Sequence, residues 1–393
     1  MKDYCTSSVH PSLRSWSYRK VFLTGATGLI GGQMLHDLLE LPQVEEVVCL
    51  VRPSNGHTGM QRLERRLKRA GVRGEKLGGW MKRVRGAVGS LNNELWGLGE
   101  DDLRWVREEA ELLVHCAAST SFVDAEGCES LNVGGTRNML GLVRGARALR
   151  RLVHFSTATL CGFIPNAVIR EDDSLARPGN HLFAYTRTKA EAERILWEAA
   201  DELPLLVVRP SITLACGCRD RKEAKLFLWS LVAMSQLPYV PVKRDARMDI
   251  VTLDFVVKST MRLIARNDRL KHDCYHLTAG ERNAVRAEDV YDLACAASTR
   301  SASALPEVVD PDEWTDAHRL AIEAQGLGTL YEALNLYLPF INLNLVYDNT
   351  RLIEELGDDL PELPKFTEYM NEMVAVIDPE LVRTAVGAGP FGM

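Results

Sequence analysis

The stretch FLTGATGLIGG, residues 22–32, decides the fold. It follows a short apolar run typical of a strand and opens a helical pattern. Gly25 permits a tight turn, Gly28 lets backbone N–H groups approach a pyrophosphate, and Gly31 allows a helix to pack closely on a strand. In this context a dinucleotide-binding turn is favoured over a glycine-rich turn without a ligand. The expected cofactor contacts in this stretch are Thr24, Gly25, Thr27, Gly28, Leu29, Ile30 and Gly31.

Short runs rich in β-branched residues alternate with longer helical patterns up to about residue 210. These runs are residues 20–25, 45–52, 82–88, 111–118, 151–157 and 203–210. Between the first two, Ile30, Met34 and Leu38 recur at the spacing of one helix face. The alternation predicts an α/β fold, a Rossmann-type doubly wound parallel sheet with helices on both faces.

Composition narrows the functional classes. The 393 residues carry a formal net charge of −6, which gives no global positive field for binding nucleic acid. The nine cysteines lack a disulfide-framework spacing, and Cys216 and Cys218 have no second ligand pair, so we expect reduced thiols and no metal. No apolar run reaches the roughly 18 residues of a membrane span, and residues 1–20 contain no apolar h-region, so we expect neither a membrane span nor secretion. We therefore expect a cytoplasmic protein; oligomeric state stays open.

The second predicted strand ends at Arg52, where a fold that prefers NAD usually places an acidic residue. A guanidinium there forms a charge-assisted contact with a 2′-phosphate. Arg52 therefore favours NADP(H), and its alternative role is a solvated surface arginine. The segment that follows, residues 62–85, is dense in Arg and Lys. It is either a solvated helix face or a surface for phosphates or an acidic protein partner.

Tyr185 and Lys189 lie four residues apart in a helical segment, so their side chains leave one helix face. An ammonium near a phenol favours the phenolate and lowers the pKa of the tyrosine. Ser156 and Thr157 end a predicted strand at the carboxyl edge of the sheet, where doubly wound folds bind ligands. These residues predict a catalytic site; the alternative is a surface helix with a chance Tyr-x-x-x-Lys pattern.

Several motifs together resemble the extended short-chain dehydrogenase/reductase family. They are the glycine turn, HCAAST at 115–120, LNVGGT at 131–136, STATLCG at 156–162, Tyr185-x-x-x-Lys189 and VVRPSI at 207–212. The resemblance implies a triad of Thr157, Tyr185 and Lys189, with Lys189 also holding the nicotinamide ribose. It implies supporting roles for Ser156 and Asn132, and cofactor contacts at Ala117, Ala118, Pro210 and Ser211. The family's Gly-Asp after the third strand is replaced by Gly86-Ala87, which removes that carboxylate from adenine recognition.

Within that family the chain most resembles thioester reductase domains and fatty acyl-CoA reductases. The residues behind this resemblance are LVRP at 50–53, DIVTLDFVV at 249–257 and the tail at 337–357. It implies an NADPH-dependent reductase of an acyl thioester, on coenzyme A or a carrier protein, giving an aldehyde; the sequence leaves open whether a second reduction to an alcohol follows. The alternatives are a reductase of a ketone, hydroxysteroid or nucleotide sugar, and a nucleotide-sensing protein without turnover.

The expected organisation has three parts. Residues 1–17 form a leader and residues 18–215 an NADP-binding Rossmann domain, to which a strand near 249–257 returns. Residues 216–393 form a smaller, mainly helical substrate-binding region, whose apolar run at 224–234 is core that partly lines an acyl pocket. His115 and His154 are expected to be buried structural histidines, and Asp249 and Asp254 to cap the helix that follows.

Overall fold

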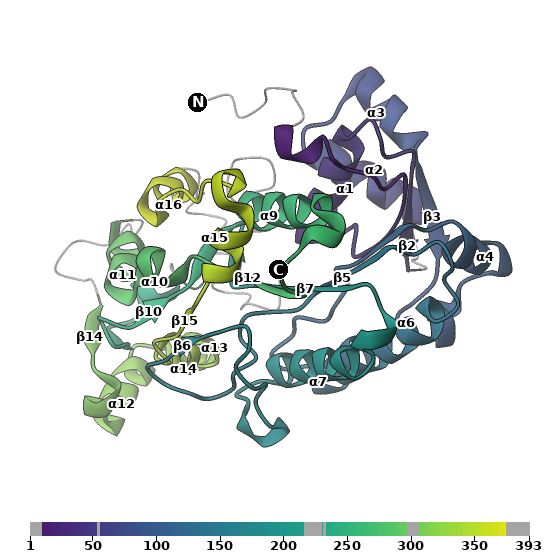
Figure 1. Cartoon of the computed structure of the whole chain (residues 1–393). Coiled ribbons are helices and arrows are strands. Elements are labelled where there is room, and N and C mark those ends of the chain that lie inside the picture. The colour runs from purple at the N-terminus through teal and green to yellow at the C-terminus, as the bar shows by residue number, and fades with distance from the viewer. Residues whose placement is uncertain (1–9, 53–55, 216–229, 231–232, 297–305, 375–393) are drawn as a thin grey trace.

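A seven-stranded parallel sheet forms the centre of the molecule (Figure 1). The computed structural model describes residues 10–52, 56–215, 230, 233–296 and 306–374. The strand order is β12-β7-β5-β4-β1-β2-β3. The strands are β1 (Lys20–Thr24), β2 (Glu46–Val51), β3 (Val84–Val88), β4 (Leu112–His115), β5 (Arg151–Phe155), β7 (Leu205–Pro210) and β12 (Cys274–Leu277). All six predicted strands and the doubly wound α/β fold are confirmed.

Helices cover both faces of this sheet (Figure 1). On one face α1 (Leu29–Glu40) packs against α2 (Gly59–Arg69) and α9 (Leu253–Ala265), with α3 (Gly74–Met81) beside α2. On the other, α6 (Gly135–Val143) packs against α4 (Glu100–Glu108) and α7 (Ala184–Glu198). The stripe predicted for the first helix is confirmed, because Met34 and Leu38 are fully buried in the core that α1 shares with the sheet.

The strand order changes direction between β1, which leads into the glycine turn, and its neighbour β4. β1 pairs with β2 on one side and with β4 on the other. In doubly wound sheets a crevice forms at this switch point, at the carboxyl ends of the strands. The fold therefore places the ends of β1, β4 and β5 side by side as a candidate binding edge.

The chain after β7 returns to the sheet by a different strand from the one predicted. β11 (Ile250–Thr252) pairs with β8 (Ile212–Leu214) in a separate two-stranded sheet. The strand that extends the main sheet is β12, which pairs with β7. The run at 249–257 is strand-like only at its start, because Thr252 caps α9 by accepting from the Phe255 amide.

The C-terminal region is mainly helical and has its own apolar core. Its helices are α10 (Gly280–Asn283), α11 (Ala287–Ala296), α12 (Asp316–Ala324), α13 (Gly328–Asn335), α14 (Leu338–Ile341), α15 (Thr350–Leu356) and α16 (Phe366–Val374). Short strand pairs join it: β9 (Tyr239–Pro241) with β14 (Glu307–Val309), β10 (Arg247–Met248) with β13 (Val285–Arg286), and β15 (Val346–Tyr347) with β6 (Val168–Ile169). Trp16, in the predicted leader, is buried in the core beside α1.

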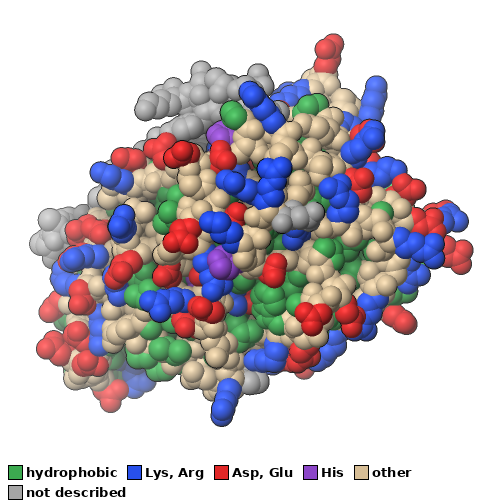
Figure 2. Space-filling model, in the orientation of Figure 1, with side chains coloured by type: hydrophobic (Ala, Val, Ile, Leu, Met, Phe, Trp, Pro, Cys, Tyr) green, Lys and Arg blue, Asp and Glu red, His purple; other side chains and the backbone are tan. Residues whose placement is uncertain are grey.

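Charges of both signs are mixed over the face of the molecule shown in Figure 2. Across the described ranges, no helix combines the length and the apolar character that crossing a bilayer requires. The pair Cys216 and Cys218 and most of the apolar run at 224–234 lie outside the described residues. Of that run, Ser230, Ala233 and Met234 are described, and the last two are buried in the C-terminal core.

Candidate active site

The glycine turn has the geometry expected of a cofactor cradle. Gly25 adopts a φ of +74°, and a Cβ there would lie 2.9 Å from the backbone nitrogen of Ala117. A Cβ on Gly31 would lie 2.3 Å from the carbonyl oxygen of Gly25, so the first turn of α1 packs directly on the glycine turn. Thr27 and Gly28 are exposed, whereas Leu29 and Ile30 are half-buried against the core.

The N-terminus of α1 fits a pyrophosphate. Gly28 is its N-cap, no side chain caps the helix, and its first turn holds no acidic residue. The first N–H groups of a helix carry partial positive charge and attract phosphate. Thr24 differs from the other predicted contacts, because its hydroxyl lies 2.9 Å from His115 Nδ1 and accepts from the Ala117 amide at 3.1 Å. Thr24 thus joins β1 to β4.

Arg52 is exposed at the end of β2, next to the start of α2. Its carbonyl oxygen accepts a hydrogen bond from the Arg62 guanidinium. Arg65 bonds His57 across the same loop at 2.8 Å. Arg66 is buried and donates to the Leu29 carbonyl in the first turn of α1 at 3.2 Å. Part of the basic segment therefore surrounds the end of β2 and reaches the glycine turn.

Thr157 and Tyr185 are brought together by the fold. Thr157 is buried two residues beyond β5, and Tyr185 lies in the first turn of α7. Burial raises the pKa of Tyr185 to about 12, and a hydrogen bond with the Thr157 side chain opposes that rise. The sequence led us to expect a lowered pKa; burial reverses the direction. Tyr185 is therefore a phenol at neutral pH, able to donate a proton.

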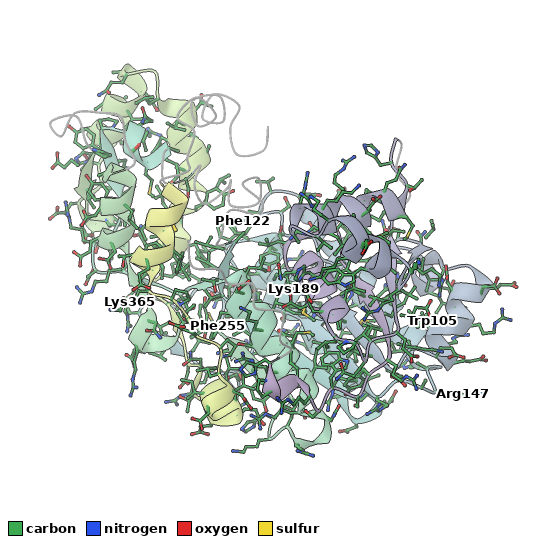
Figure 3. All side chains as sticks on the ribbon, turned by 90° about the horizontal axis from the view of Figure 1, so that it is seen from above. Trp105, Phe122, Arg147, Lys189, Phe255 and Lys365 are labelled. Atoms are coloured by element: carbon green, nitrogen blue, oxygen red, sulfur yellow. The ribbon has the colours of Figure 1, made fainter. Side chains whose placement is uncertain are left out.

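Lys189 lies in the interior of the larger lobe (Figure 3) and is 3% exposed. Its Nζ donates to the Phe155 carbonyl at 2.6 Å and lies 3.3 Å from His154 Nε2. Burial lowers the pKa of Lys189 to about 8, against the opposing charge of Glu193. One turn later on α7, that Glu193 carboxylate is bound by the Arg209 guanidinium, with both side chains almost fully buried.

Asn132 links the end of β4 to α7. It lies in the π-helix η3 (Glu129–Gly134) and binds both backbone groups of Ser119, at 2.8 and 2.9 Å. Its amide also donates to the Thr188 hydroxyl at 3.0 Å, next to Lys189. Single π-turns occur often at functional sites. Ser156 is buried and its hydroxyl has no hydrogen-bond partner in the structure, so it is a free donor beside Thr157.

Ser211 and Asp249 form a structural link below the end of β7. The Ser211 hydroxyl lies 2.6 Å from Asp249 Oδ1, which also accepts from the Ala279 amide at 2.8 Å. Gly280, at the start of α10, donates to the other oxygen at 3.1 Å. We expected Asp249 to cap α9, and this prediction is wrong, because its carboxylate binds Ser211, Ala279 and Gly280 instead. Asp254, in the first turn of α9, pairs with Lys258. Pro210 is buried and Ala118 half-buried at the same sheet edge.

An aromatic cluster beside Tyr185 was not anticipated from the sequence. The Phe122 ring stacks on Phe183, with centroids 4.3 Å apart, and lies 6.2 Å from the Tyr185 ring. Tyr337 of the C-terminal region completes the cluster at 5.4 Å from Phe122. In Figure 3, Phe122 lies on the side of Lys189 that faces the smaller lobe. Its position after the motif HCAAST was the one available signal.

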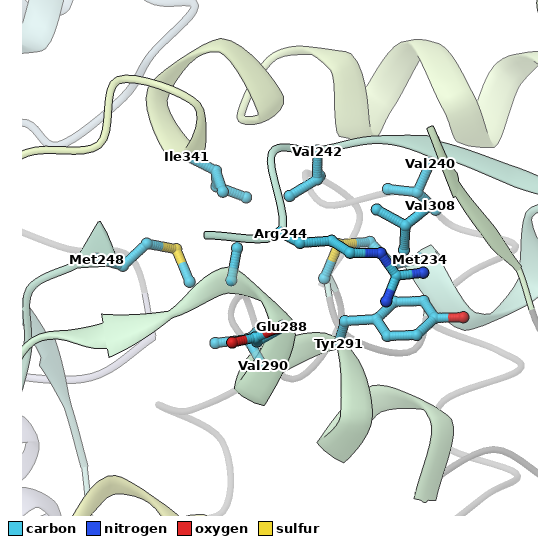
Figure 4. Close-up of a pocket in the computed structure, with 11 residues that line it drawn as sticks. Met234, Val240, Val242, Arg244, Met248, Glu288, Val290, Tyr291, Val308 and Ile341 are labelled. Carbon is cyan, nitrogen blue, oxygen red and sulfur yellow. The ribbon is translucent and has the colours of Figure 1, made fainter. Parts of the chain in front are cut away.

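A pocket lies within the C-terminal region, between α11, β9 and β10 (Figure 4). The space between its walls, including the part open to solvent, is about 390 Å³. Most of its walls are apolar, with polar groups from three residues at one side. The lining includes Met234, Val240, Val242, Arg244, Met248, Glu288, Val290, Tyr291, Val308 and Ile341.

Comparisons with known proteins show the family to which the chain belongs. Residues 23–260 match an NAD-binding family described as male sterility protein. A nonribosomal peptide synthetase, asaC, of Aspergillus flavus is 29% identical over 266 residues, 64% of this chain and 25% of that protein. Fatty acyl-CoA reductase 1 of Homo sapiens is 28% identical over 278 residues, 62% of this chain and 54% of that protein.

The chain thus spans a quarter of the first relative's length and about half of the second's. The crystal structure of the terminal R domain from the myxalamid PKS-NRPS biosynthetic pathway has a TM-score of 0.73 at 24% identity, covering 91% of this chain and 90% of that one. This likeness confirms the fold. Because the family match spans more than half of the sequence, the chain belongs to the NAD-binding male sterility protein family of extended short-chain dehydrogenases/reductases.

Proposed function

We propose that this protein is an NADPH-dependent reductase that converts an acyl thioester to an aldehyde. The observation that carries the proposal is the Thr157–Tyr185 hydroxyl pair, with buried Lys189 one turn along α7. This pair lies at the carboxyl edge of the sheet that also bears the glycine turn. A sensing protein has no need of a proton donor there.

Different residues of the chain would hold the cofactor, stabilise the developing negative charge and donate the proton. When bound, NADPH supplies hydride to the thioester carbon, its pyrophosphate held by Gly25, Gly28 and the first turn of α1. The Thr157 hydroxyl hydrogen-bonds the carbonyl oxygen as negative charge develops on it, and Tyr185 protonates that oxygen. The hydroxyl of the resulting hemithioacetal then returns its proton to the Tyr185 phenolate as the C=O bond re-forms and the C–S bond breaks. The departing thiolate takes a proton from solvent, so that a thiol and an aldehyde are released. Reduction of the aldehyde to an alcohol by a second NADPH uses the same groups.

Two groups of cations support the choice of NADPH and of a phosphate-bearing thioester. Arg52 is exposed at the end of β2, where it can bind the 2′-phosphate of the adenosine ribose. Arg62 and Arg65 lie beside it and add positive charge for coenzyme A phosphates or an acidic carrier protein. The names of the relatives point the same way, since one is a peptide synthetase and another reduces fatty acyl-CoA.

The acyl group needs an apolar surface, and two regions offer one. Phe122, Phe183 and Tyr337 lie directly beside Tyr185 and suit the segment next to the thioester. The pocket of Figure 4 suits a more distant part of the acyl group, because Met234, Met248 and Ile341 form its wall. Its residue Met248 directly precedes Asp249, which holds the end of β7.

The test is a panel of acyl-CoAs, acyl-carrier thioesters, aldehydes and ketones mixed with NADPH. We expect thioesters to cause loss of nicotinamide absorbance and to give aldehyde or alcohol by product analysis. Turnover of ketones, hydroxysteroids or nucleotide sugars alone would replace the thioester assignment with the alternative substrate classes. No turnover of any substrate, with tight NADPH binding, would favour a sensing role.

Tyr185→Phe tests the site itself. It should leave NADPH binding nearly intact and lower turnover by at least about 100-fold, the usual contribution of a positioned acid. Tyr239→Phe is the matched control, because Tyr239 lies in β9 of the C-terminal region and stacks edge-on against His318. Unchanged turnover in Tyr185→Phe would remove this residue from the mechanism.

A further inference from the structure

A row of buried polar side chains connects the strand before the glycine turn to Lys189. The Thr24 hydroxyl at the end of β1 lies 2.9 Å from His115 Nδ1 at the end of β4. The His115 ring lies 5.4 Å from the His154 ring of β5, centroid to centroid. His154 Nε2 in turn lies 3.3 Å from Lys189 Nζ. The ends of three adjacent strands thus connect the cofactor turn to the catalytic helix.

The contact with Lys189 fixes the tautomer of His154. An ammonium group has only donors, so the facing Nε2 must be the unprotonated acceptor and Nδ1 carries the hydrogen. His154 Nδ1 is buried with no hydrogen-bond partner in the structure. A buried donor left unpaired costs about 1 to 3 kcal/mol. The unpaired Nδ1–H would bring no benefit to a histidine that only fills space. It is required, however, if Nε2 is to accept a hydrogen bond from Lys189.

Lys189 depends on this acceptor because its surroundings offer few others. The titratable groups that face it are His154, His115, Cys116, Glu193 and, on its own helix, Tyr185. Among the described residues no carboxylate hydrogen-bonds Nζ, and the Glu193 carboxylate is held by Arg209. Burial keeps His154 neutral, because it lowers the pKa of that imidazole well below its ordinary value.

We propose that His154 is a positioning residue, whose neutral Nε2 holds the Lys189 ammonium in its charged form and aims it at the reaction site. Together with the Phe155 carbonyl it occupies two of the three N–H groups and leaves one for the cofactor ribose or Tyr185. The proposal rests on the proposed function for the role of Lys189, but the contact itself does not.

The experiment compares variants that keep or remove the acceptor. In His154→Gln the amide oxygen can occupy the place of Nε2, whereas His154→Leu has similar volume and no acceptor. His154→Asn is the second variant, with its oxygen near the place of Nδ1 instead. His276→Leu is the matched control for losing a buried neutral imidazole, because burial lowers the pKa of His276, on β12, to about 3. Circular dichroism establishes that each variant is folded.

The readouts are the pH dependence of turnover on the acyl thioester and, separately, of NADPH binding. A hydrogen bond to a charged group is worth about one pKa unit or more, so loss of the acceptor lets the Lys189 proton leave at lower pH. We expect the alkaline limb of both profiles to move down by about one pH unit in His154→Leu and His154→Asn, with about threefold lower turnover at pH 7.5. His154→Gln and His276→Leu should keep the limb of the unmodified protein.

Identical alkaline limbs in His154→Leu and His154→Gln would overturn the proposal, as would an equal shift in His276→Leu. If the unmodified protein reduces no thioester, the proposed function fails by itself. The pH dependence of NADPH binding then still decides the role of His154, since it involves no acyl substrate.

Discussion

Two buried cations are associated with successive turns of α7, Lys189 on the helix itself and Arg209 through Glu193, and their surroundings differ completely. Arg209 of β7 is bound by Glu193 of α7 through Nε, at 3.0 and 3.2 Å, and its Nη1 donates to the Glu171 carbonyl at 3.0 Å. Lys189, one turn earlier on α7, meets a carbonyl and an imidazole instead. Burial lowers the pKa of both cations, but the Glu193 charge more than offsets this for Arg209.

The difference separates a structural charge from a functional one. A buried charge with its own counter-ion stabilises the charged form and joins two elements. A buried charge without one is poised to change its protonation or to attract a developing negative charge, which is what a catalytic site requires. We therefore expect the two cations to respond in opposite ways to mutation.

Lys189→Met should have the largest effect, and that effect should be a loss of activity without a loss of stability. The substitution keeps the length of the side chain and removes the charge, so turnover should fall by roughly 10⁴-fold. Stability at pH 7 should stay the same or rise, because a buried unpaired ammonium is costly. Initial rates with NADPH and urea unfolding measure the two effects. Turnover within tenfold of the unmodified protein would remove Lys189 from the mechanism.

Glu193→Gln should show the opposite pattern. It leaves the Arg209 charge buried without its counter-ion, which costs about 3 to 5 kcal/mol of unfolding free energy. Glu202→Gln is the control, because Glu202 is exposed and pairs with Arg144 at 3.5 Å, so it should change stability by less than about 1 kcal/mol. Urea unfolding measures both variants. Equal losses of unfolding free energy would show that the buried Arg209–Glu193 pair contributes no more to stability than an exposed pair.

The comparison also shows what the sequence could and could not predict. The strands, the first helix and the Thr157–Tyr185 neighbourhood were predictable, since each depends on local periodicity or on the end of a strand. The bond between His154 and Lys189 was not, because it joins residues 35 positions apart through side-chain geometry. The same holds for Asp249, which reaches Ser211 and the start of α10 from 38 and about 30 positions away.

The direction of the Tyr185 pKa was also out of reach. Spacing places Lys189 one helix turn from Tyr185, but only the structure shows that the ammonium bonds Phe155 and His154 and that desolvation raises the pKa of the phenol. The seventh strand of the sheet, β12, was not predicted from the sequence, for a different reason. Its four residues, CYHL, include no β-branched residue, so they lack the pattern by which the other strands were predicted.

A pH dependence of stability follows from the lowered pKa of Lys189. Between pH 8 and 10.5 the unfolded chain holds the lysine proton and the folded chain has released it, so the contribution to stability rises with pH. From pH 7.5 to 9.5 the unmodified protein should gain about 2 kcal/mol relative to Lys189→Met. Urea unfolding of both proteins at the two pH values measures this. A constant difference would mean that Lys189 stays charged throughout.

Arg52→Ala extends the comparison to an exposed cation and should have the smallest effect. Because Arg52 is exposed, its charge contributes little to folding, and unfolding free energy should change by less than about 0.5 kcal/mol. Its one expected effect is on the cofactor, where loss of the contact with the 2′-phosphate should lower the preference for NADPH over NADH by about tenfold. Arg104→Ala is the control, because Arg104 is an equally exposed cation on α4 that pairs with Asp101. Binding titrations in which both variants keep the preference of the unmodified protein would assign the 2′-phosphate to other residues, and Arg62, which bonds the Arg52 carbonyl, would be tested next.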